Sequence, residues 1–450
     1  MWEHAADASH TSADVAAAVQ HADHARELYL QRGDSRAAAR AQAIAGQALR
    51  NWGHYAEARE QLAAAAAVLR DDPDTDTVRA LGELAQLEVF AGSPDGDKLT
   101  TEALALGQAL GTGAGQLTGL FTTRGIYHGM AGRHPQSVAY LREAARMAAQ
   151  ADDNVRLGVV LLNLSEVLAF TDPTAAADAA RTAAGHLRRA GARNHLSFAI
   201  TNLARALLLL GDWDDAEREL SQAVDSGELA GIDYLPCYLG WLAALRGDIA
   251  AAETMLAGLQ DLRASEDPQD KALISIAEAF TAAARHQPGD ALRHARDALS
   301  HVGALGITHE FVCWAWPLAA RAARDLGEVT AVGELLALLD SYPPGHLAPM
   351  LRAERDLARA RRTGDASDPD VTASFAAVIA ALREHSTPYH LAHGLLDQAQ
   401  HLGGRGEADA AAAAADEARG IARRLRCRPL LDRAEMISAE PGVMRLAPSQ

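Results

Sequence analysis

One stretch of the sequence decides the fold: Ala204-Arg-Ala-Leu-Leu-Leu-Leu-Gly211-Asp-Trp213-Asp-Asp-Ala216-Glu-Arg-Glu-Leu-Ser-Gln-Ala223. Apolar residues on both sides of Gly211 recur at the three- and four-residue spacing of amphipathic helices. A glycine between two such segments fits a helix C-cap, because its backbone adopts the left-handed conformation that side chains disfavour. The stretch therefore predicts two antiparallel helices joined by a short turn.

The same glycine-containing turn returns along the chain at a nearly constant distance. From Gly53 to Gly92 is 39 residues, from Gly92 to Gly132 is 40, and from Gly132 to Gly211 is 79, which is two units. Further copies contain Gly247, Gly327, Gly364 and Gly406. A fixed period of this size is typical of stacked helix pairs, and no segment alternates apolar and polar residues as a strand would. The sequence therefore predicts an all-α repeat protein.

These residues resemble the tetratricopeptide repeat. Around its turn glycine, that motif has a small residue seven positions before, an aromatic residue two after, and alanines five and twelve after. Ala204, Trp213, Ala216 and Ala223 occupy all four places around Gly211. Other units keep the small residue, as Gly46, Gly125, Gly240, Ala320 and Ala399. The resemblance implies a right-handed superhelical solenoid of about ten antiparallel tetratricopeptide-like helix pairs, with lengthened helices because the period is nearer 40 than the usual ~34 residues.

The repeat pattern also divides the chain. We expect an N-terminal half-repeat or cap over residues 1–32, the helical array over residues 33–426, and a capping helix with a flexible tail over residues 427–450. Residues 11–31 resemble a second helix whose first helix is missing. This half-unit suggests that the chain is the cut end of something longer, or begins at an unusual start.

Composition limits the functions open to the chain. Its net charge is −17, with 49 % apolar and 5 % aromatic residues. This charge disfavours non-specific binding to nucleic acid or anionic membranes, so neither is expected as a direct partner. The three cysteines, Cys237, Cys313 and Cys427, follow no metal or redox spacing. No apolar run reaches the about 18 residues of a membrane span, and we expect a cytoplasmic protein with reduced thiols.

No motif predicts catalysis or a cofactor. Residues 92–100 superficially resemble a phosphate-binding loop, which needs four residues between its glycines and a lysine directly after the second. Here three residues separate Gly92 from Gly96, and Asp97 takes the place of the lysine. An ordinary loop between helices is the better interpretation, and we predict a protein that is not an enzyme and uses no cofactor.

A metal site is also not predicted. His390, His393 and Asp397 are spaced to share one face of a helix and could offer nitrogen and oxygen ligands. The site would still need a strong ligand from another helix, and none is identified. Solvated or packing histidines are the preferred interpretation.

The best candidate site is the concave face of the solenoid. In the repeat family, the first helix of each pair lines this face at four positions of the motif. The corresponding side chains here are Arg40, Gln47, Arg50, Phe198, Arg205, Leu208, Tyr234, Trp241, Trp314, Arg321, Arg324, His393 and Gln400. Arginines and aromatics there would bind an extended ligand with carboxylates or phosphates and apolar anchors. The alternative is that the lengthened helices rotate these positions, and that Trp241 and Trp314 belong to the core.

A wider resemblance suggests a role. Three segments are similar to the C-terminal helical region of large actinobacterial signalling proteins: Arg79-Ala-Leu-Gly-Glu-Leu-Ala, Asp212-Trp-Asp-Asp-Ala-Glu and Leu425-Arg-Cys-Arg-Pro-Leu-Leu-Asp-Arg-Ala. Those proteins combine an AAA or STAND ATPase core with a cyclase-type or LuxR-type DNA-binding domain. The resemblance implies a non-catalytic scaffold that binds a protein, a peptide or an upstream ATPase, cyclase or DNA-binding region, as a sensing or regulatory arm. The alternatives are a sensor for a charged small-molecule or peptide effector, and an enzyme hidden in a helical cavity.

Overall fold

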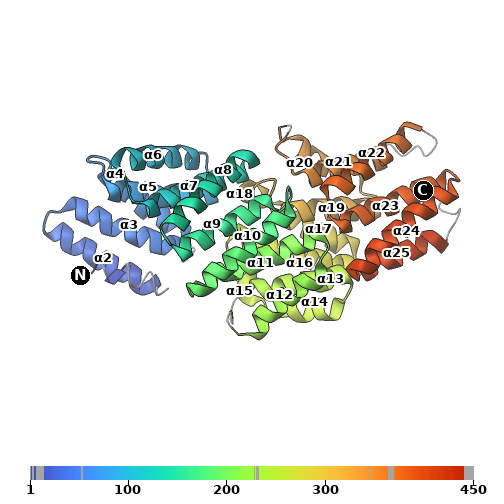
Figure 1. Cartoon of the computed structure of the whole chain (residues 1–450), viewed down its shortest axis with the longest axis horizontal. Helices are drawn as coiled ribbons and strands as arrows, with labels where there is room; N and C mark the ends of the chain where they lie inside the picture. The colour runs from blue at the N-terminus through green and yellow to red at the C-terminus, as the bar shows by residue number, and fades with distance from the viewer. Residues whose placement is uncertain are drawn as a thin grey trace. The chain divides into compact units, whose positions relative to one another are not determined.

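The computed structural model describes residues 2, 5, 6, 15–51, 54–227, 229, 233–343, 345–362 and 369–439. Every regular element in this part of the chain is a helix, so the all-α prediction is confirmed (Figure 1). None of the helices in these residues combines the length and apolar character needed to cross a membrane. The predicted turns at Gly53 and Gly364 lie outside the described residues.

The chain divides into two compact units, and each is described by itself. The N-terminal unit covers residues 1–163 and the C-terminal unit covers residues 164–450. The N-terminal unit contains α2 (Val15–Gln31), α3 (Ser35–Asn51), α4 (Tyr55–Leu69), α5 (Thr75–Phe90), α6 (Asp95–Leu110), α7 (Ala114–Met130) and α8 (His134–Gln150). The division falls within α9 (Asn154–Leu168).

The C-terminal unit continues the same succession of helices. It contains α10 (Pro173–Arg189), α11 (Arg193–Leu210), α12 (Trp213–Asp225), α13 (Tyr234–Arg246), α14 (Ile249–Ala257), α15 (Gln260–Ala264), α16 (Pro268–Ala284), α17 (Pro288–Leu299), α18 (Val302–Leu305), α19 (Glu310–Asp325), α20 (Val329–Asp340), α21 (Pro349–Arg362), α22 (Pro369–His385), α23 (Pro388–Gly404), α24 (Ala408–Leu425) and α25 (Arg428–Ala439). From α3/α4 to α23/α24 the described helices form ten pairs, with α15 and α18 as short insertions. The predicted number of about ten pairs is confirmed.

The turns between paired helices use glycine as the sequence predicts. Gly211 caps α11 and Gly247 caps α13, with φ angles of 84° and 85°. A side chain is strained in this left-handed conformation, which glycine adopts freely. A second reason applies at both positions, because a Cβ atom on Gly211 would lie 2.9 Å from Pro388, and one on Gly247 would lie 2.9 Å from Pro429.

Inside several pairs, a small residue of the first helix meets a leucine sixteen positions later in the second. A Cβ atom on Gly46 or Gly125 would lie 2.7 Å from Cγ of Leu62 or Leu141, respectively. The same offset joins Gly240 to Leu256, at 3.2 Å. In the stretch that decides the fold, the equivalent pair is Ala204 and Leu220, and both side chains are fully buried. This close packing is the physical reason for the small residue in the repeat.

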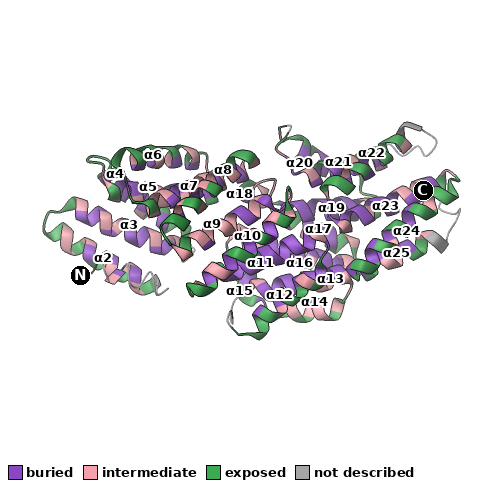
Figure 2. Ribbon diagram, in the orientation of Figure 1, coloured by how far each residue is buried: buried purple, intermediate pink, exposed green. Residues whose placement is uncertain are grey.

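The core of the C-terminal unit includes an aromatic cluster from the first helices of several pairs. The ring of Trp314 lies 5.4 Å from Trp241, 5.9 Å from Phe280 and 5.8 Å from Tyr389, measured between centroids. These residues come from α13, α16, α19 and α23. Figure 2 shows the buried residues on the faces where neighbouring helices meet.

The last helices of the C-terminal unit return to its earlier turns. Cys427 lies at the start of α25, and its thiol donates a 3.1 Å hydrogen bond to the carbonyl of Leu245, 182 residues earlier. Together with the approaches of Pro388 to Gly211 and of Pro429 to Gly247, this bond joins the C-terminal helices to the ends of α11 and α13.

Candidate functional site: a buried arginine cluster

The predicted groove residues of the N-terminal unit join consecutive first helices. Arg40 and Arg50 of α3 form ion pairs with Asp76 and Glu83 of α5, at 3.6 and 2.9 Å. Gln47 donates a 2.9 Å hydrogen bond to the same Glu83. Because α5 is the first helix of the next pair, these side chains hold the array together. Each of these three side chains already has a partner inside the protein.

The predicted aromatic groove residues of the C-terminal unit pack within the protein. Trp241 and Trp314 are 0 % and 1 % exposed, so the structure places both in the core. Leu208 is also buried. The rings of Phe198 and Tyr234 meet edge to face at 4.9 Å, and the Tyr234 hydroxyl donates a hydrogen bond to Asp270.

Arg205 takes part in a group in which carboxylates outnumber arginines. Its guanidinium lies 2.9 Å from Glu310 and 3.8 Å from Glu166. The hydroxyl of Tyr238 donates a 2.9 Å hydrogen bond to the same oxygen of Glu310. Burial raises the pKa of Glu310 above its ordinary value, although Arg205 opposes this rise. Arg205, Tyr238 and Glu310 are all buried, so this group stabilises the fold of the inner helices.

A second group gathers more arginines than carboxylates. Arg324 of α19 and Arg433 of α25 donate to Oδ1 of Asp397, at 2.9 and 2.5 Å. Arg361, near the end of α21, forms an ion pair with Oδ2 of the same carboxylate. The Asp397 side chain is 2 % exposed. One buried carboxylate therefore serves three arginines from three helices.

A fourth arginine lies in the same region of the unit. The nearest atoms of Arg321 and Glu354 are 3.8 Å apart, which is beyond hydrogen-bonding distance, and both side chains are buried. The guanidinium of Arg321 lies over the ring of Tyr389, 5.9 Å from its centroid. Among the described residues, neither terminal nitrogen of Arg321 has a hydrogen-bond partner. We name Arg321, Arg324, Arg361 and Arg433, with Glu354 and Asp397, the arginine cluster.

The cluster also encloses two histidines that stay neutral. Nδ1 of His393 accepts a hydrogen bond from Arg433 at 3.2 Å, and Nδ1 of His390 lies 2.7 Å from the hydroxyl of Thr387. Burial lowers the pKa of both histidines well below the ordinary value, and the positive charge of Arg321 lowers it further. Gln400 of α23 accepts a hydrogen bond from Arg433.

The histidines and Asp397 face arginines rather than a metal position. Within the described residues, no group of three His, Cys, Asp or Glu side chains is arranged to hold a metal ion. Both oxygens of Asp397 are engaged by guanidinium groups. The arrangement can instead bind and orient an anion, because guanidinium offers several fixed donors to oxygen acceptors.

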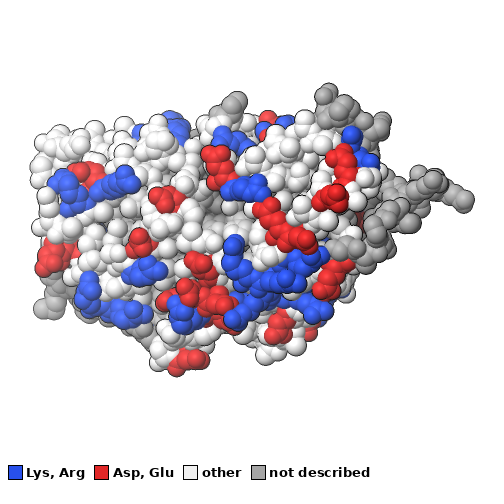
Figure 3. All heavy atoms as spheres, turned by 45° about the vertical axis from the view of Figure 1, so that its right-hand side comes forward, with Lys and Arg blue, Asp and Glu red and all other residues white. Residues whose placement is uncertain are grey.

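The sequence interpretation named Arg321, Arg324 and His393 but missed Arg361 and Arg433. Arg361 lies at the end of a first helix, and Arg433 lies in the helix after the last pair. No local motif marks either residue, since their meeting depends on how the C-terminal helices return toward α19. Figure 3 shows one face of the surface, on which basic side chains gather into a patch although the chain carries an acidic excess.

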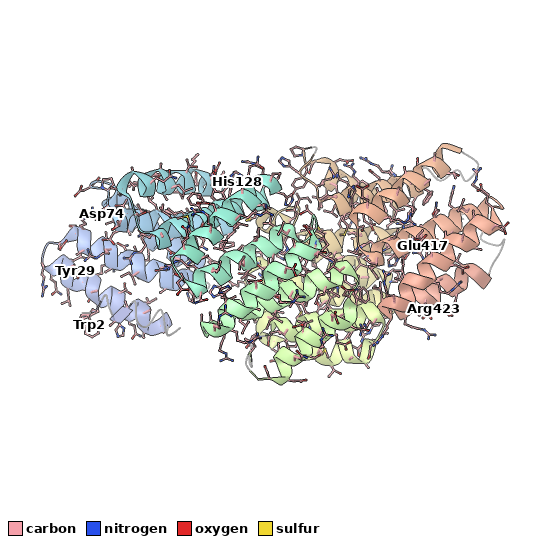
Figure 4. The ribbon with its side chains drawn as sticks, in the orientation of Figure 1. Trp2, Tyr29, Asp74, His128, Glu417 and Arg423 are labelled. Carbon is pink, nitrogen blue, oxygen red and sulfur yellow. The ribbon has the colours of Figure 1, made fainter. Side chains whose placement is uncertain are left out.

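A different polar residue is buried in the N-terminal unit. His128 of α7, labelled in Figure 4, is stacked on Tyr140 of α8 with a centroid distance of 5.4 Å. Burial, together with the positive charges of Arg124 and Arg133, lowers the pKa of His128 to about 4. The imidazole is therefore neutral at physiological pH and packs as an aromatic ring.

The fold and its internal packing define a class, the all-α helical-repeat solenoids built from antiparallel helix pairs. No protein-family model matches the chain, and no curated protein matches it. Similar solved structures include the human IFIT1 dimer with m7Gppp-AAAA, with 13 % identity over 89 % of this chain and 90 % of that chain and a TM-score of 0.47. A Rap protein complexed with competence and sporulation factor has 12 % identity over 85 % of this chain and 97 % of that chain, with a TM-score of 0.46. Yeast Tom70 has 11 % identity over 97 % of this chain and 95 % of that chain, with a TM-score of 0.35. These similarities concern the helical-repeat fold alone.

Proposed function

We propose that this chain is a non-catalytic helical-repeat scaffold that binds an acidic group of a protein or peptide partner at the arginine cluster of the C-terminal unit. One observation carries the proposal. Among the described residues, four guanidinium groups share two buried carboxylates, whereas Arg50 and Arg205 each pair with their own carboxylates. A buried positive charge without a counter-ion is costly, and an acidic partner would supply that counter-ion.

The chemistry of the cluster favours binding over catalysis. Arginine has only donors and does not exchange its proton near neutral pH, so it orients an anion without acting as acid or base. The Asp397 carboxylate is held in ion pairs, and the two histidines are neutral and enclosed. These features support a role in recognition.

We further propose that binding serves regulation in a cytoplasmic signalling protein. The resemblance to the helical arms of actinobacterial signalling ATPases supports this role, with an upstream ATPase, cyclase or DNA-binding region as the partner. The alternative is a sensor for a small charged effector. The enclosure of the cluster favours that alternative, because only a single acidic group could reach Arg321 and Arg361.

The proposal is tested by calorimetric titration of the full chain with short peptides that carry Asp or Glu residues. Arg433→Gln removes one donor of the cluster, and Arg428→Gln is the matched control on the same helix, since Arg428 is exposed and pairs with Asp432. We expect Arg433→Gln to weaken binding by about tenfold or more, as for the loss of a charge-assisted hydrogen bond. Equal binding by both variants, or no binding by the unmodified chain, would overturn the proposal.

A further inference from the structure

The arginine cluster has donors that its own carboxylates do not use. Both terminal nitrogens of Arg321 and Nε of Arg361 are buried, and among the described residues they have no hydrogen-bond partner. The two side chains are 6 % and 11 % exposed. Buried polar groups are normally satisfied, but two nitrogens of Arg205 are unused as well, so it is the unused donors together with the excess of guanidinium groups that point to a ligand here.

The charges of the cluster also remain unbalanced when its surroundings are included. Arg324 pairs with the exposed Asp325 as well as with Asp397. Setting this surface pair aside leaves Arg321, Arg361 and Arg433 against Glu354 and Asp397 in the buried part. One positive charge is then in excess, and His390 and His393 are neutral. The buried part therefore favours an added anion.

The directions of the donors select the shape of that anion. Arg321, Arg361 and Arg433 come from three different helices, α19, α21 and α25. A planar carboxylate accepts well from two parallel donors, and Asp397 already supplies such a group. A tetrahedral oxyanion has acceptor oxygens in several directions and can satisfy donors from three helices at once.

Access to the cluster limits the size of the ligand group. The side chains of Arg324 and Arg433 are 34 % and 21 % exposed, whereas Arg321 and Arg361 are nearly enclosed. The outer part of the cluster, at Arg324 and Arg433, is therefore open to solvent. Only a terminal group can reach the inner two, which disfavours a phosphodiester within a chain.

We infer that the arginine cluster is a binding site for the terminal phosphate group of a small molecule, seated on Arg321, Arg361 and Arg433 beside Asp397. This inference rests on the proposed function, because it names the chemical class of the acidic group that the same site accepts. Phosphate brings the missing negative charge and more acceptor oxygens than a carboxylate. Asp397 keeps the arginines in place when the site is empty of ligand.

Calorimetry on the full chain tests the inference, with inorganic phosphate, sulfate and acetate as probes at constant ionic strength. We expect phosphate and sulfate to bind and acetate to bind at least about tenfold more weakly, since acetate offers fewer acceptors. Arg361→Gln and Arg433→Gln should each weaken phosphate binding by about tenfold or more. Arg359→Gln is the control on α21, because Arg359 is 46 % exposed and pairs with Asp340. Circular dichroism shows whether each variant keeps its helices, and a folded variant with undiminished phosphate binding would count against the site.

The other outcomes separate the two proposals. If acidic peptides bind through Arg433 but phosphate and sulfate do not, the proposed function stands and the phosphate assignment is wrong. If none of these probes binds, both fail. A phosphoserine peptide distinguishes the source of the phosphate: binding more than about tenfold tighter than inorganic phosphate would overturn the small-molecule assignment in favour of a peptide.

Discussion

Arg205 of α11 and Glu310 of α19 are separated by 105 residues in the sequence, yet their side chains meet at 2.9 Å in the buried interior of the C-terminal unit. The contact joins the first helices of two pairs that are not neighbours in the chain. From the sequence alone, Arg205 is expected to bind a ligand. In the structure its guanidinium neutralises a buried carboxylate, so we expect its main role to be stabilisation of the fold.

Replacement of Arg205 by alanine should therefore destabilise the protein. The change leaves Glu310 buried without its cation, which typically costs about 3–5 kcal/mol. Urea unfolding followed by circular dichroism measures the loss. Arg218→Ala is the control, since Arg218 is exposed on α12 and its pair with Asp215 should contribute less than about 1 kcal/mol. Equal stability of the two variants would show that Glu310 finds another partner.

The helix-pair contact in the N-terminal unit predicts opposite effects for two glycines of α7. A Cβ atom on Gly125 would overlap the buried Leu141, so Gly125→Ala should lower the free energy of unfolding by about 1–3 kcal/mol. A Cβ atom on Gly119 would meet no atom of the described residues within 4 Å. Gly119→Ala should therefore stabilise the helix by up to about 1 kcal/mol. Thermal and urea denaturation test both, and effects of the same sign would contradict the assigned contact.

At Gly240, the equivalent position in the C-terminal unit, stability should depend on the size of the side chain that is introduced. A Cβ atom on Gly240 would lie 3.2 Å from Leu256, which is tight but close to tolerable. We expect Gly240→Ala to be nearly neutral and Gly240→Leu to cost about 1–3 kcal/mol through overpacking. Unchanged stability of Gly240→Leu would mean that the pair can open without loss.

Stability should fall in mild acid because of His128. Its pKa in the folded protein is about 4, whereas the unfolded chain takes up the proton near the ordinary value of 6.5. Below pH 6.5 the unfolded state therefore binds more protons, and stability falls as the pH drops toward 4, by at most about 1.4 kcal/mol per pH unit. His128→Phe keeps the aromatic packing and should remove this contribution.

The measurement compares urea unfolding of the original chain and His128→Phe at about pH 7 and pH 5. Between pH 7 and pH 5, the free energy of unfolding of His128→Phe should fall by up to about 2 kcal/mol less than that of the original chain. His385→Phe, at an exposed position at the end of α22, is the control. The assignment fails if both variants follow the original pH dependence.

Within the arginine cluster, removing the charge of Asp397 should lower the free energy of unfolding more than removing the charge of Arg433. Asp397→Asn leaves three arginines without their shared carboxylate, and we expect a loss of about 3–5 kcal/mol. Arg433→Gln leaves Asp397 with two arginines and relieves like-charge repulsion, so the change should stay within about 1 kcal/mol. Burial together with the charge of Arg324 lowers the pKa of Arg433 to about 9, in agreement with this repulsion. Added phosphate should stabilise each variant less than it stabilises the original chain.

The helix pairs could be predicted from the sequence because their contacts are local. The offset from Gly125 to Leu141 is short, and the turn between the two helices is determined by residues next to it. The number of pairs followed from the period of the turn glycines. The candidate site was predicted less well: Arg321, Arg324 and His393 lie at the cluster, but Arg40, Gln47 and Arg50 bind the next helix of the array.

The sequence by itself determined the all-α class, the positions of the turns and the small residues that let paired helices touch, because each depends on side chains a few turns apart. Only the tertiary structure decided which arginines form an ion pair with a carboxylate of their own and which share a carboxylate with other arginines. That result depends on the path by which α23 and α25 return to the earlier pairs, bringing Asp397 and Arg433 beside Arg324 and Arg361. No short-range pattern encodes this path, since it sums small rotations between many successive helix pairs.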